Sequence, residues 1–307
     1  MINLTTLLQK RRKFTDTSTI EYWENYVKMD TKFVRDRRYY HYYNEIPYTR
    51  WPIYICTALF YVMFYGVLAF NKYEYATILA LSSLVTMIFW ISMWFIDLIN
   101  ESLIFGKYNR KLRSVIIAGF MIFLSSEVLL FGGFFWAFFD RFFHVPAIMG
   151  GTSIPMGLEL LIWYKKPLYA TLILLFSAIV FNGASYCMKW GSWTYAVAYS
   201  SFGLLLGYIF LFIQVSEYKH LAFSMSDGVY GSCFYLLTGF HGFHVLVGMI
   251  FLNIQHERLV SLHFSRERHL GYSLAMIYWH FVDIVWIFLF FFVYVFNNIG
   301  FQHFIIV

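Results

Sequence analysis

Five side chains that could carry protons or bind a metal lie inside long apolar stretches of this sequence. They are one carboxylate and two pairs spaced three residues apart: Glu127, His241 with His244, and His280 with Asp283. Residues three positions apart lie on one face of a helix, so each pair would direct both groups to the same side. An ionisable group at membrane depth costs about 3 kcal/mol unless it is paired or hydrated. These five residues therefore form the candidate site.

Three kinds of chemistry are open to this set: a proton relay, a metal site or a structural hydrogen-bond network. A haem or di-iron site needs several ligands that converge on one centre, and two histidines three residues apart do not supply that set. Four other histidines and three cysteines are scattered singly, without a Cys-x-x-Cys pair: His41, His144, His220, His303, Cys56, Cys187 and Cys233. We expect no metal ligand and no catalytic residue, and interpret the five mainly as a buried hydrogen-bond network.

The composition indicates the elements that must position these residues. Of the 307 residues, 60% are hydrophobic and only 13% are charged, whereas soluble domains have about 25% charged residues. A membrane-spanning helix needs about 20 mostly apolar residues. Seven such stretches occur, without the short alternation that an outer-membrane barrel requires: 53–70, 76–96, 115–139, 168–188, 195–213, 229–252 and 272–296. The sequence therefore predicts an all-α, polytopic membrane protein with seven transmembrane helices.

The distribution of positive charge predicts the orientation of these helices. With alternating spans, 18 Lys and Arg residues fall on the side of the N-terminus and 5 on the opposite side. An excess of Lys and Arg marks the side on which insertion begins, here the cytoplasm or the mitochondrial matrix. Seven spans place the C-terminus on the other side. The basic N-terminal segment is thus interpreted as an orientation signal, and no nucleic-acid partner is expected.

Several ordered motifs resemble those of cytochrome c oxidase subunit III. They have the order and spacing of that family and extend over about residues 51–296. The longest are Ser-Glu-Tyr at 216–218, Ser-Asp-Gly-Val-Tyr-Gly-Ser at 226–232, Thr-Gly-Phe-His-Gly-Phe-His-Val at 238–245 and Tyr-Trp-His-Phe-Val-Asp-Ile-Val-Trp at 278–286. Each of the five candidate residues falls on a motif position of this family.

The resemblance implies a non-redox core subunit of the haem–copper oxidase that passes electrons from cytochrome c to oxygen and pumps protons. Haem and copper would belong to partner subunits, with no cofactor held by this chain. The partners would be the catalytic subunit I and subunit II, in the mitochondrial inner membrane. The family fold also implies a two-helix hairpin and a five-helix bundle with a lipid-filled cleft that holds phospholipids.

The resemblance divides the chain into three parts. Residues 51–296 form the seven-helix subunit III domain. Residues 1–50 are a matrix-side extension and residues 297–307 a C-terminal tail, and neither has a counterpart in the family pattern. We expect both to contact lineage-specific accessory subunits.

Departures from the family pattern affect the expected lipid contacts. Residues 182–185 read Asn-Gly-Ala-Ser where the family commonly has Trp-Ala-His-His, residues 94–97 lack one arginine, and Asn100 replaces another. The candidates that remain for lipid binding are Arg258, His263, Trp94 and Glu101. Arginine can hold a phosphate through paired, charge-assisted hydrogen bonds. The alternative is that Arg258 only anchors its loop at an anionic membrane surface.

Two other functions remain open. A seven-span transporter or proton channel would also use Glu127 and Asp283, although broken helices in two related halves are typical of such transporters and the seven stretches here are unbroken. A quinol oxidase subunit III is the nearer alternative, because the electron-donor site lies on other subunits.

Overall fold

All regular structure in the described part of the chain is helical. The computed structural model describes residues 49–103, 110–144 and 161–298. Within these ranges seven helices are long and apolar enough to cross a membrane, which confirms the predicted all-α architecture. In chain order the elements are α3 (Trp51–Phe70), α4 (Ala76–Leu103), α5 (Arg110–Phe143), α6 (Lys166–Trp190), α7 (Trp193–Tyr218), α8 (Gly228–Val260), α9 (Leu270–Leu289), η2 (Phe290–Val295) and α10 (Phe296–Asn298). The expected extension and tail fall outside the described residues, apart from 49–50 and 297–298.

Two helices are much longer than the apolar stretches that predicted them. The structure has 34 residues in α5 and 33 in α8. Their additional turns carry charged side chains, among them Arg141 and Arg258, in the last turns of the two helices. Long basic side chains can keep an apolar stem in the membrane and a charge at its surface. These helices therefore continue past the apolar stretches that the sequence marks.

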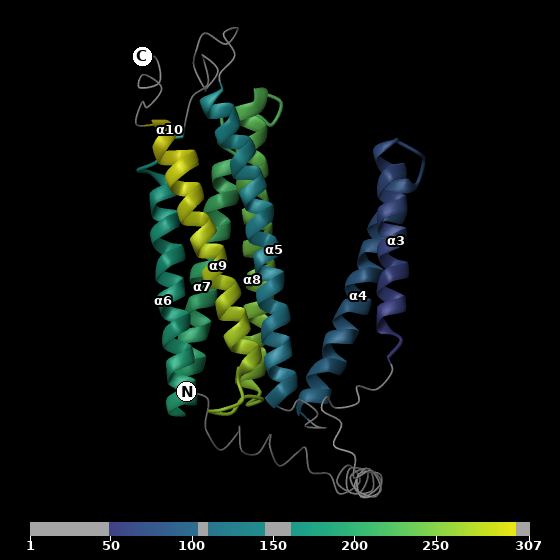
Figure 1. Cartoon of the computed structure of the whole chain (residues 1–307), viewed down its shortest axis with the longest axis vertical. Coiled ribbons are helices and arrows are strands. Elements are labelled where there is room, and N and C mark those ends of the chain that lie inside the picture. The colour runs from purple at the N-terminus through teal and green to yellow at the C-terminus, as the bar shows by residue number, and fades with distance from the viewer. Residues whose placement is uncertain (1–48, 104–109, 145–160, 299–307) are drawn as a thin grey trace, which may run out of the picture. The chain divides into compact units, whose positions relative to one another are not determined.

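The helices α3 and α4 form an antiparallel hairpin, as the resemblance implies (Figure 1). Only the five residues 71–75 connect the two helices, which forces them to run antiparallel. At the open end of the hairpin, Nε1 of Trp51 donates a hydrogen bond to Oδ2 of Asp97 over 2.7 Å. Close by, the rings of Tyr54 and Trp90 stack with their centroids 5.0 Å apart. Few side chains of the hairpin are buried, so contacts between half-buried and exposed side chains, such as these, join its two helices.

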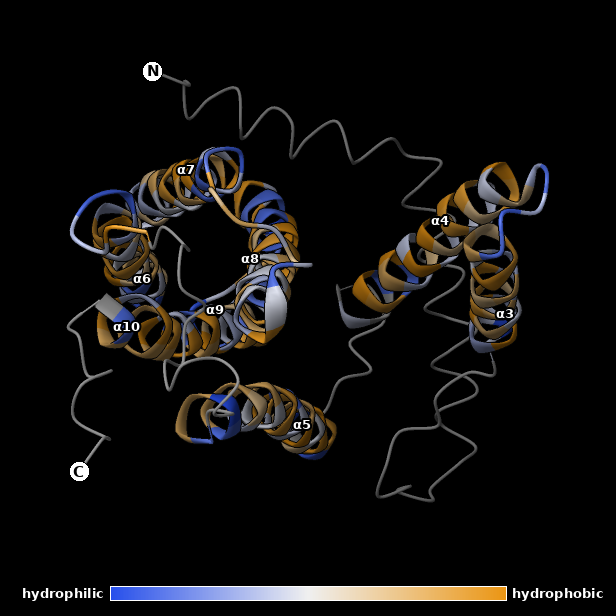
Figure 2. Cartoon of the chain, turned by 90° about the horizontal axis from the view of Figure 1, so that it is seen from above, coloured by the Kyte–Doolittle hydropathy of each residue, from blue (hydrophilic) through white to orange (hydrophobic). Residues whose placement is uncertain are grey.

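The helices from α5 onwards form a separate compact unit, which begins at Arg113. Figure 2 shows α6, α7, α8 and α9 arranged as a ring, with α5 beside α9 on its outer side. Aromatic side chains attach α5 to this ring. Phe134 packs on Phe240 of α8 with centroids 4.9 Å apart, and Phe135 packs edge-on against Phe288 of α9.

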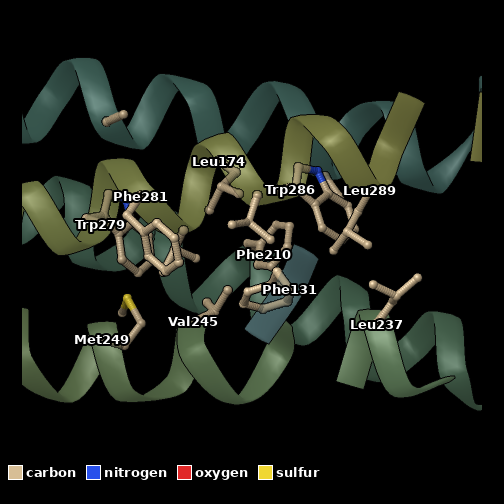
Figure 3. Packing of buried hydrophobic residues seen from close by; sticks show 14 of the residues in the cluster. Phe131, Leu174, Phe210, Leu237, Val245, Met249, Trp279, Phe281, Trp286 and Leu289 are labelled. Atoms are coloured by element: carbon tan, nitrogen blue, oxygen red, sulfur yellow. The ribbon is translucent and has the colours of Figure 1, made fainter. Parts of the chain in front are cut away.

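Large aromatic side chains fill the interior of the ring (Figure 3). Trp279, Trp286 and Phe210 are completely buried there. The close approach of α7 to its neighbours depends on two glycines. A Cβ atom on Gly203 would lie 2.8 Å from the ring of Phe181, and one on Gly207 would lie 2.3 Å from the sulfur of Met249. A larger residue at Gly203 would displace the buried ring of Phe181, and one at Gly207 would displace the flexible end of Met249.

The last span changes its helical form near its end. α9 gives way at Phe290 to the π-helix η2. A π-helix is rare, bonds each residue to the fifth one along instead of the fourth, and often lies beside a functional site. In η2 the buried residues are Val293 and Tyr294. The hydroxyl of Tyr294 is thereby placed inside the ring of helices.

Candidate functional site

Glu127 of α5 and His244 of α8 are hydrogen-bonded. Oε2 of Glu127 lies 2.8 Å from Nε2 of His244, and Nδ1 of His244 lies 2.7 Å from the backbone oxygen of Phe240. A carbonyl oxygen can only accept a hydrogen bond, so Nδ1 carries a proton and donates it. One further proton lies between Nε2 and the carboxylate. The pair is therefore electrically neutral overall, whichever of the two atoms holds that proton.

The surroundings of this pair exclude most of the solvent. The side chain of Glu127 is 19% exposed and that of His244 is 9% exposed. Phe131, one turn along α5 from Glu127, packs edge-on against the imidazole with centroids 5.2 Å apart. A hydrogen bond between partly ionic groups strengthens where water is excluded. The pair therefore forms a polar connection between α5 and the ring of helices.

His280 and Asp283 lie near each other, as their spacing predicts, but they are not directly hydrogen-bonded. Nδ1 of His280 is 3.6 Å from Oδ2 of Asp283. Nε2 of His280 instead lies 3.0 Å from Oδ1 of Asn182 on α6. Asp283 is buried, and neither of its carboxylate oxygens has a hydrogen-bond partner among the described residues.

His241 lies apart from both pairs. Its ring is completely buried, with no hydrogen-bond partner for either nitrogen in the described part of the chain. It packs against Trp286 with centroids 4.9 Å apart and edge-on against Phe210. Although His241 and His244 are three residues apart, His241 faces the interior of the ring and His244 faces α5. The structure thus divides the five predicted residues among three places.

The sequence analysis did not select Glu217 as a site residue. Glu217 lies in the last turn of α7, is 1% exposed, and accepts a hydrogen bond from the hydroxyl of Tyr294 over 2.9 Å. Gln214 lies one turn earlier, beside the hydroxyls of Tyr218 and Tyr294. The predicted span ended at residue 213, which placed Glu217 in a loop. The Ser-Glu-Tyr motif at 216–218 was the signal that could have identified Glu217, because these three residues form the last turn of α7.

A second polar contact lies next to Glu217. The hydroxyl of Tyr218 is 2.6 Å from Oγ1 of Thr238 on α8. Thr238 donates its own proton to the carbonyl of Phe234 over 2.7 Å. Tyr218 must therefore donate to Thr238. Together, Glu217 and Tyr218 join the end of α7 to η2 and to α8.

The lipid candidate Arg258 lies near the end of α8. Its Nη1 donates to Oε1 of Gln255 over 3.2 Å, and its guanidinium carbon lies 4.8 Å from the ring centroid of Phe264. Gly271 leaves the room for this arrangement, because a Cβ atom there would lie 2.9 Å from Nη1. Burial, and then the charge of Arg258, lower the pKa of His263. The two lipid candidates of this unit are therefore neighbours.

The other two lipid candidates belong to the hairpin. Trp94 is half-buried on α4 and stacks on Phe95 with centroids 6.4 Å apart. Glu101 lies in the same helix, but its side chain lies outside the described residues. The expected grouping of these two residues with Arg258 stays a prediction.

The fold and the polar contacts define a class: a polytopic helical membrane protein in which Glu127, His244 and Glu217 connect its own helices. His241 and Asp283 are buried without a hydrogen-bond partner among the described residues. Within the described ranges, no group of three or more His, Cys, Asp and Glu residues could hold a metal ion. The sequence profile of the family described as "Cytochrome c oxidase subunit III" matches residues 41–298. The chain belongs to this family, which confirms the resemblance that the motifs indicate.

Relatives from distant organisms agree with this assignment. The chain is 36% identical to "Cytochrome c oxidase subunit 3" of Rhizopus stolonifer over 275 residues, which cover 89% of this chain and 97% of the relative. It is 34% identical to the protein of the same name from Gadus morhua over 254 residues, or 83% and 97% of the two chains. The protein is therefore a multi-pass membrane subunit of an oxidoreductase complex, assembled with other oxidase subunits.

Proposed function

We propose that this chain is a non-redox core subunit of cytochrome c oxidase in the mitochondrial inner membrane. It stabilises the catalytic subunit I and binds phospholipid, and thereby supports electron transfer from cytochrome c to oxygen and the coupled pumping of protons. Haem and copper belong to partner subunits, including subunits I and II. Residues 1–50 and 297–307 meet lineage-specific accessory subunits.

The observation that carries this proposal is where the ionisable side chains make their contacts. Glu127 bonds to His244 across two helices, Glu217 bonds to Tyr294, and His280 bonds to Asn182. Each contact joins two elements of the same unit. A metal centre would need several such groups to converge on one point, and a proton relay would need them linked in a chain across the membrane. These three contacts share no residue, whereas a structural subunit needs only that its helices are held in fixed positions.

Purification of the oxidase in mild detergent tests this proposal. We expect the chain to co-purify with haem-containing subunits, and to carry no haem or transition metal when it is separated from them. Removal of the chain should leave the haem spectrum unchanged and shorten the period over which the oxidase keeps turning over. A stoichiometric transition metal on the separated chain would contradict the non-redox role. The same purification identifies the electron donor. If a partner subunit carries the ligands of a dinuclear copper centre, the donor is cytochrome c; if no partner carries them, the donor is a quinol.

The proposed lipid contact is centred on Arg258. A guanidinium can offer two parallel hydrogen bonds to a phosphate, which lysine cannot do. The stacking on Phe264 and the bond to Gln255 hold the side chain in one orientation, so less rotamer entropy is lost when a phosphate binds. His263 lies beside it and becomes a second, charged donor when its ring is protonated.

A further inference from the structure

The outer face of α9 carries one polar pair in otherwise apolar surroundings. The last span extends over Leu270–Val295, and His280 lies near its centre. The residues that share this exposed stripe are all apolar: Ile277, Ile284, Ile287 and Phe291. His280 therefore lies at mid-membrane depth, on a face that the unit itself leaves uncovered.

Asn182 of α6 completes the polar pair. One end of its side-chain amide bonds to Nε2 of His280. The other end of the amide has no partner among the described residues, and Asn182 is exposed. Its exposed neighbours on α6, Ile179 and Tyr186, are a turn away on either side. One end of the amide therefore faces the surroundings of the bundle.

A buried carboxylate lies behind this pair. Asp283 is 3.6 Å from the second ring nitrogen of His280 and is itself buried. Asp283, His280 and Asn182 thus form a line of polar groups from the interior of the unit to its outer face. The side chain of His280, at 35% exposed, is the link between the two ends.

Hydrocarbon chains are a poor cover for such a face. Lipid tails offer no hydrogen-bond donor or acceptor, and a polar group that faces them loses the bonds that it makes in water. A neighbouring transmembrane helix can supply the missing bond, because interhelical contacts of Asn side chains are common in membranes. The apolar side chains around the pair would pack against the same helix.

We propose that the face formed by Ile277, His280 and Ile284 of α9 and Asn182 of α6 receives a transmembrane helix of another oxidase subunit. That helix presents a hydrogen-bonding oxygen of a Ser, Thr, Asn or Gln side chain to the amide of Asn182. The proposal rests on the assembly of this chain with other oxidase subunits. Beyond that assembly, it specifies which face of this chain contacts the other subunit, that the contact lies at mid-membrane depth, and that Asn182 makes its hydrogen bond.

A steric block on this face tests the proposal without removing an internal hydrogen bond. Ile284 and Leu205 are matched, because their exposed fractions are 55% and 53% and each lies near the middle of its span, on α9 and α7 respectively. We expect Ile284→Trp to lower the amount of this chain retained on the detergent-purified oxidase by about tenfold, equivalent to about 1.4 kcal/mol. Leu205→Trp should leave it unchanged. Equal retention of the two variants would overturn the proposal.

A second experiment identifies the occupant. In a density map of the intact oxidase, we expect a helix of another subunit over Ile277 and Ile284, with a side-chain oxygen within hydrogen-bonding distance of Asn182. Lipid tails, the α3–α4 hairpin or a second copy of this chain at that position would each overturn the proposal, although the oxidase assignment would stand. Asn182→Leu should reduce retention as Ile284→Trp does, whereas Ser201→Leu, a similar change at an exposed position of α7, should not.

Discussion

Nε2 of His244 lies 2.8 Å from Oε2 of Glu127, across 117 residues of sequence. Because Nδ1 of the same ring donates to a backbone carbonyl, a single proton lies between the imidazole and the carboxylate. The pair needs no further partner to be neutral. A neutral, hydrogen-bonded pair of this kind is sufficient to connect α5 to α8. The first test therefore asks whether Glu127 has any role beyond this connection.

Replacement of Glu127 by Gln separates a structural role from a catalytic one. The amide of Gln can donate to Nε2 of His244, so the contact between the two helices is retained. We expect oxidase turnover to be largely intact in Glu127→Gln. Glu127→Leu should destabilise the subunit by about 1–3 kcal/mol, because the buried imidazole of His244 loses its partner. Turnover of the purified enzyme and thermal unfolding check this. A collapse of turnover in a fully assembled Gln variant would show that Glu127 carries protons in catalysis.

The hydroxyl of Tyr294 should contribute to stability in a similar way. Tyr294→Phe leaves Oε1 of Glu217 without its donor at a position that is 1% exposed. We expect a loss of about 1–3 kcal/mol, seen as a lower unfolding temperature of the purified oxidase. Tyr169→Phe, at an exposed position of α6, is the matched control and should have little effect. An unchanged unfolding temperature for Tyr294→Phe would mean that this bond contributes nothing.

Three variants separate a phosphate clamp at Arg258 from a simple surface anchor. Arg258→Ala should reduce the phospholipid that remains bound through purification, as counted by mass spectrometry of the intact subunit. Arg258→Lys keeps the charge but cannot make two parallel hydrogen bonds to a phosphate. If Arg258 clamps a phosphate, this variant should lose the bound lipid; if Arg258 is only a surface anchor, the variant should retain it. Arg268→Ala, at an exposed position, should retain the lipid. A Lys variant that retains all its lipid would favour the anchor.

His263 should influence lipid retention only in acid. Its pKa is lowered by burial and by the charge of Arg258, so the imidazole is neutral at pH 7.5 and becomes charged only below its ordinary range near pH 6.5. We expect His263→Ala to have little effect on retention at pH 7.5. At a pH low enough to protonate His263, the unsubstituted chain should hold anionic lipid more tightly than the variant does. A large loss at pH 7.5 would indicate that the neutral ring is a required donor.

The orientation of the chain can be tested at its C-terminus. The excess of Lys and Arg on the side of the N-terminus predicts an N-terminus in the matrix, and seven spans then place Val307 in the intermembrane space. In mitoplasts, where only the outer membrane is open, an added protease should remove a tag placed after Val307. Continued protection of the tag until the inner membrane is dissolved would contradict this topology.

The number of spans could be predicted from the sequence because it depends on uninterrupted apolar length, and the hairpin could be predicted because only five residues connect the first two spans. The partners of polar residues could not. Helical spacing places His241 and His244 on one side of a helix, but 3.6 residues per turn still leaves an angle of about 60° between them. That angle is enough for one ring to face Trp286 and the other Glu127. No local pattern specifies which helix lies opposite each of them.

Glu217 illustrates a second limit of prediction from sequence, namely where a helix ends. A hydropathy window ends where polar residues begin, so it assigns the last turn of α7 to a loop. Burial of Glu217 depends on η2, and hence on residues nearly 80 positions away, because the bond to Tyr294 joins positions separated by 77 residues. The short apolar run Phe290–Val295 contains no signal that separates a π-helix from an α-helix.

The π-helix also bears on changes in chain length. Eight residues of α-helix turn the chain by about 80° beyond two full turns, yet Tyr294 lies beneath Trp286, with ring centroids 6.0 Å apart. The wider turns of η2 contain one residue more than an α-helix of the same height would need, and this brings Tyr294 back to the side of Trp286. A deletion of one residue between Phe290 and Val293 would close this segment into an uninterrupted α-helix and still direct Tyr294 towards Glu217. The end of this span can therefore lose one residue while the buried contact with α7 is kept.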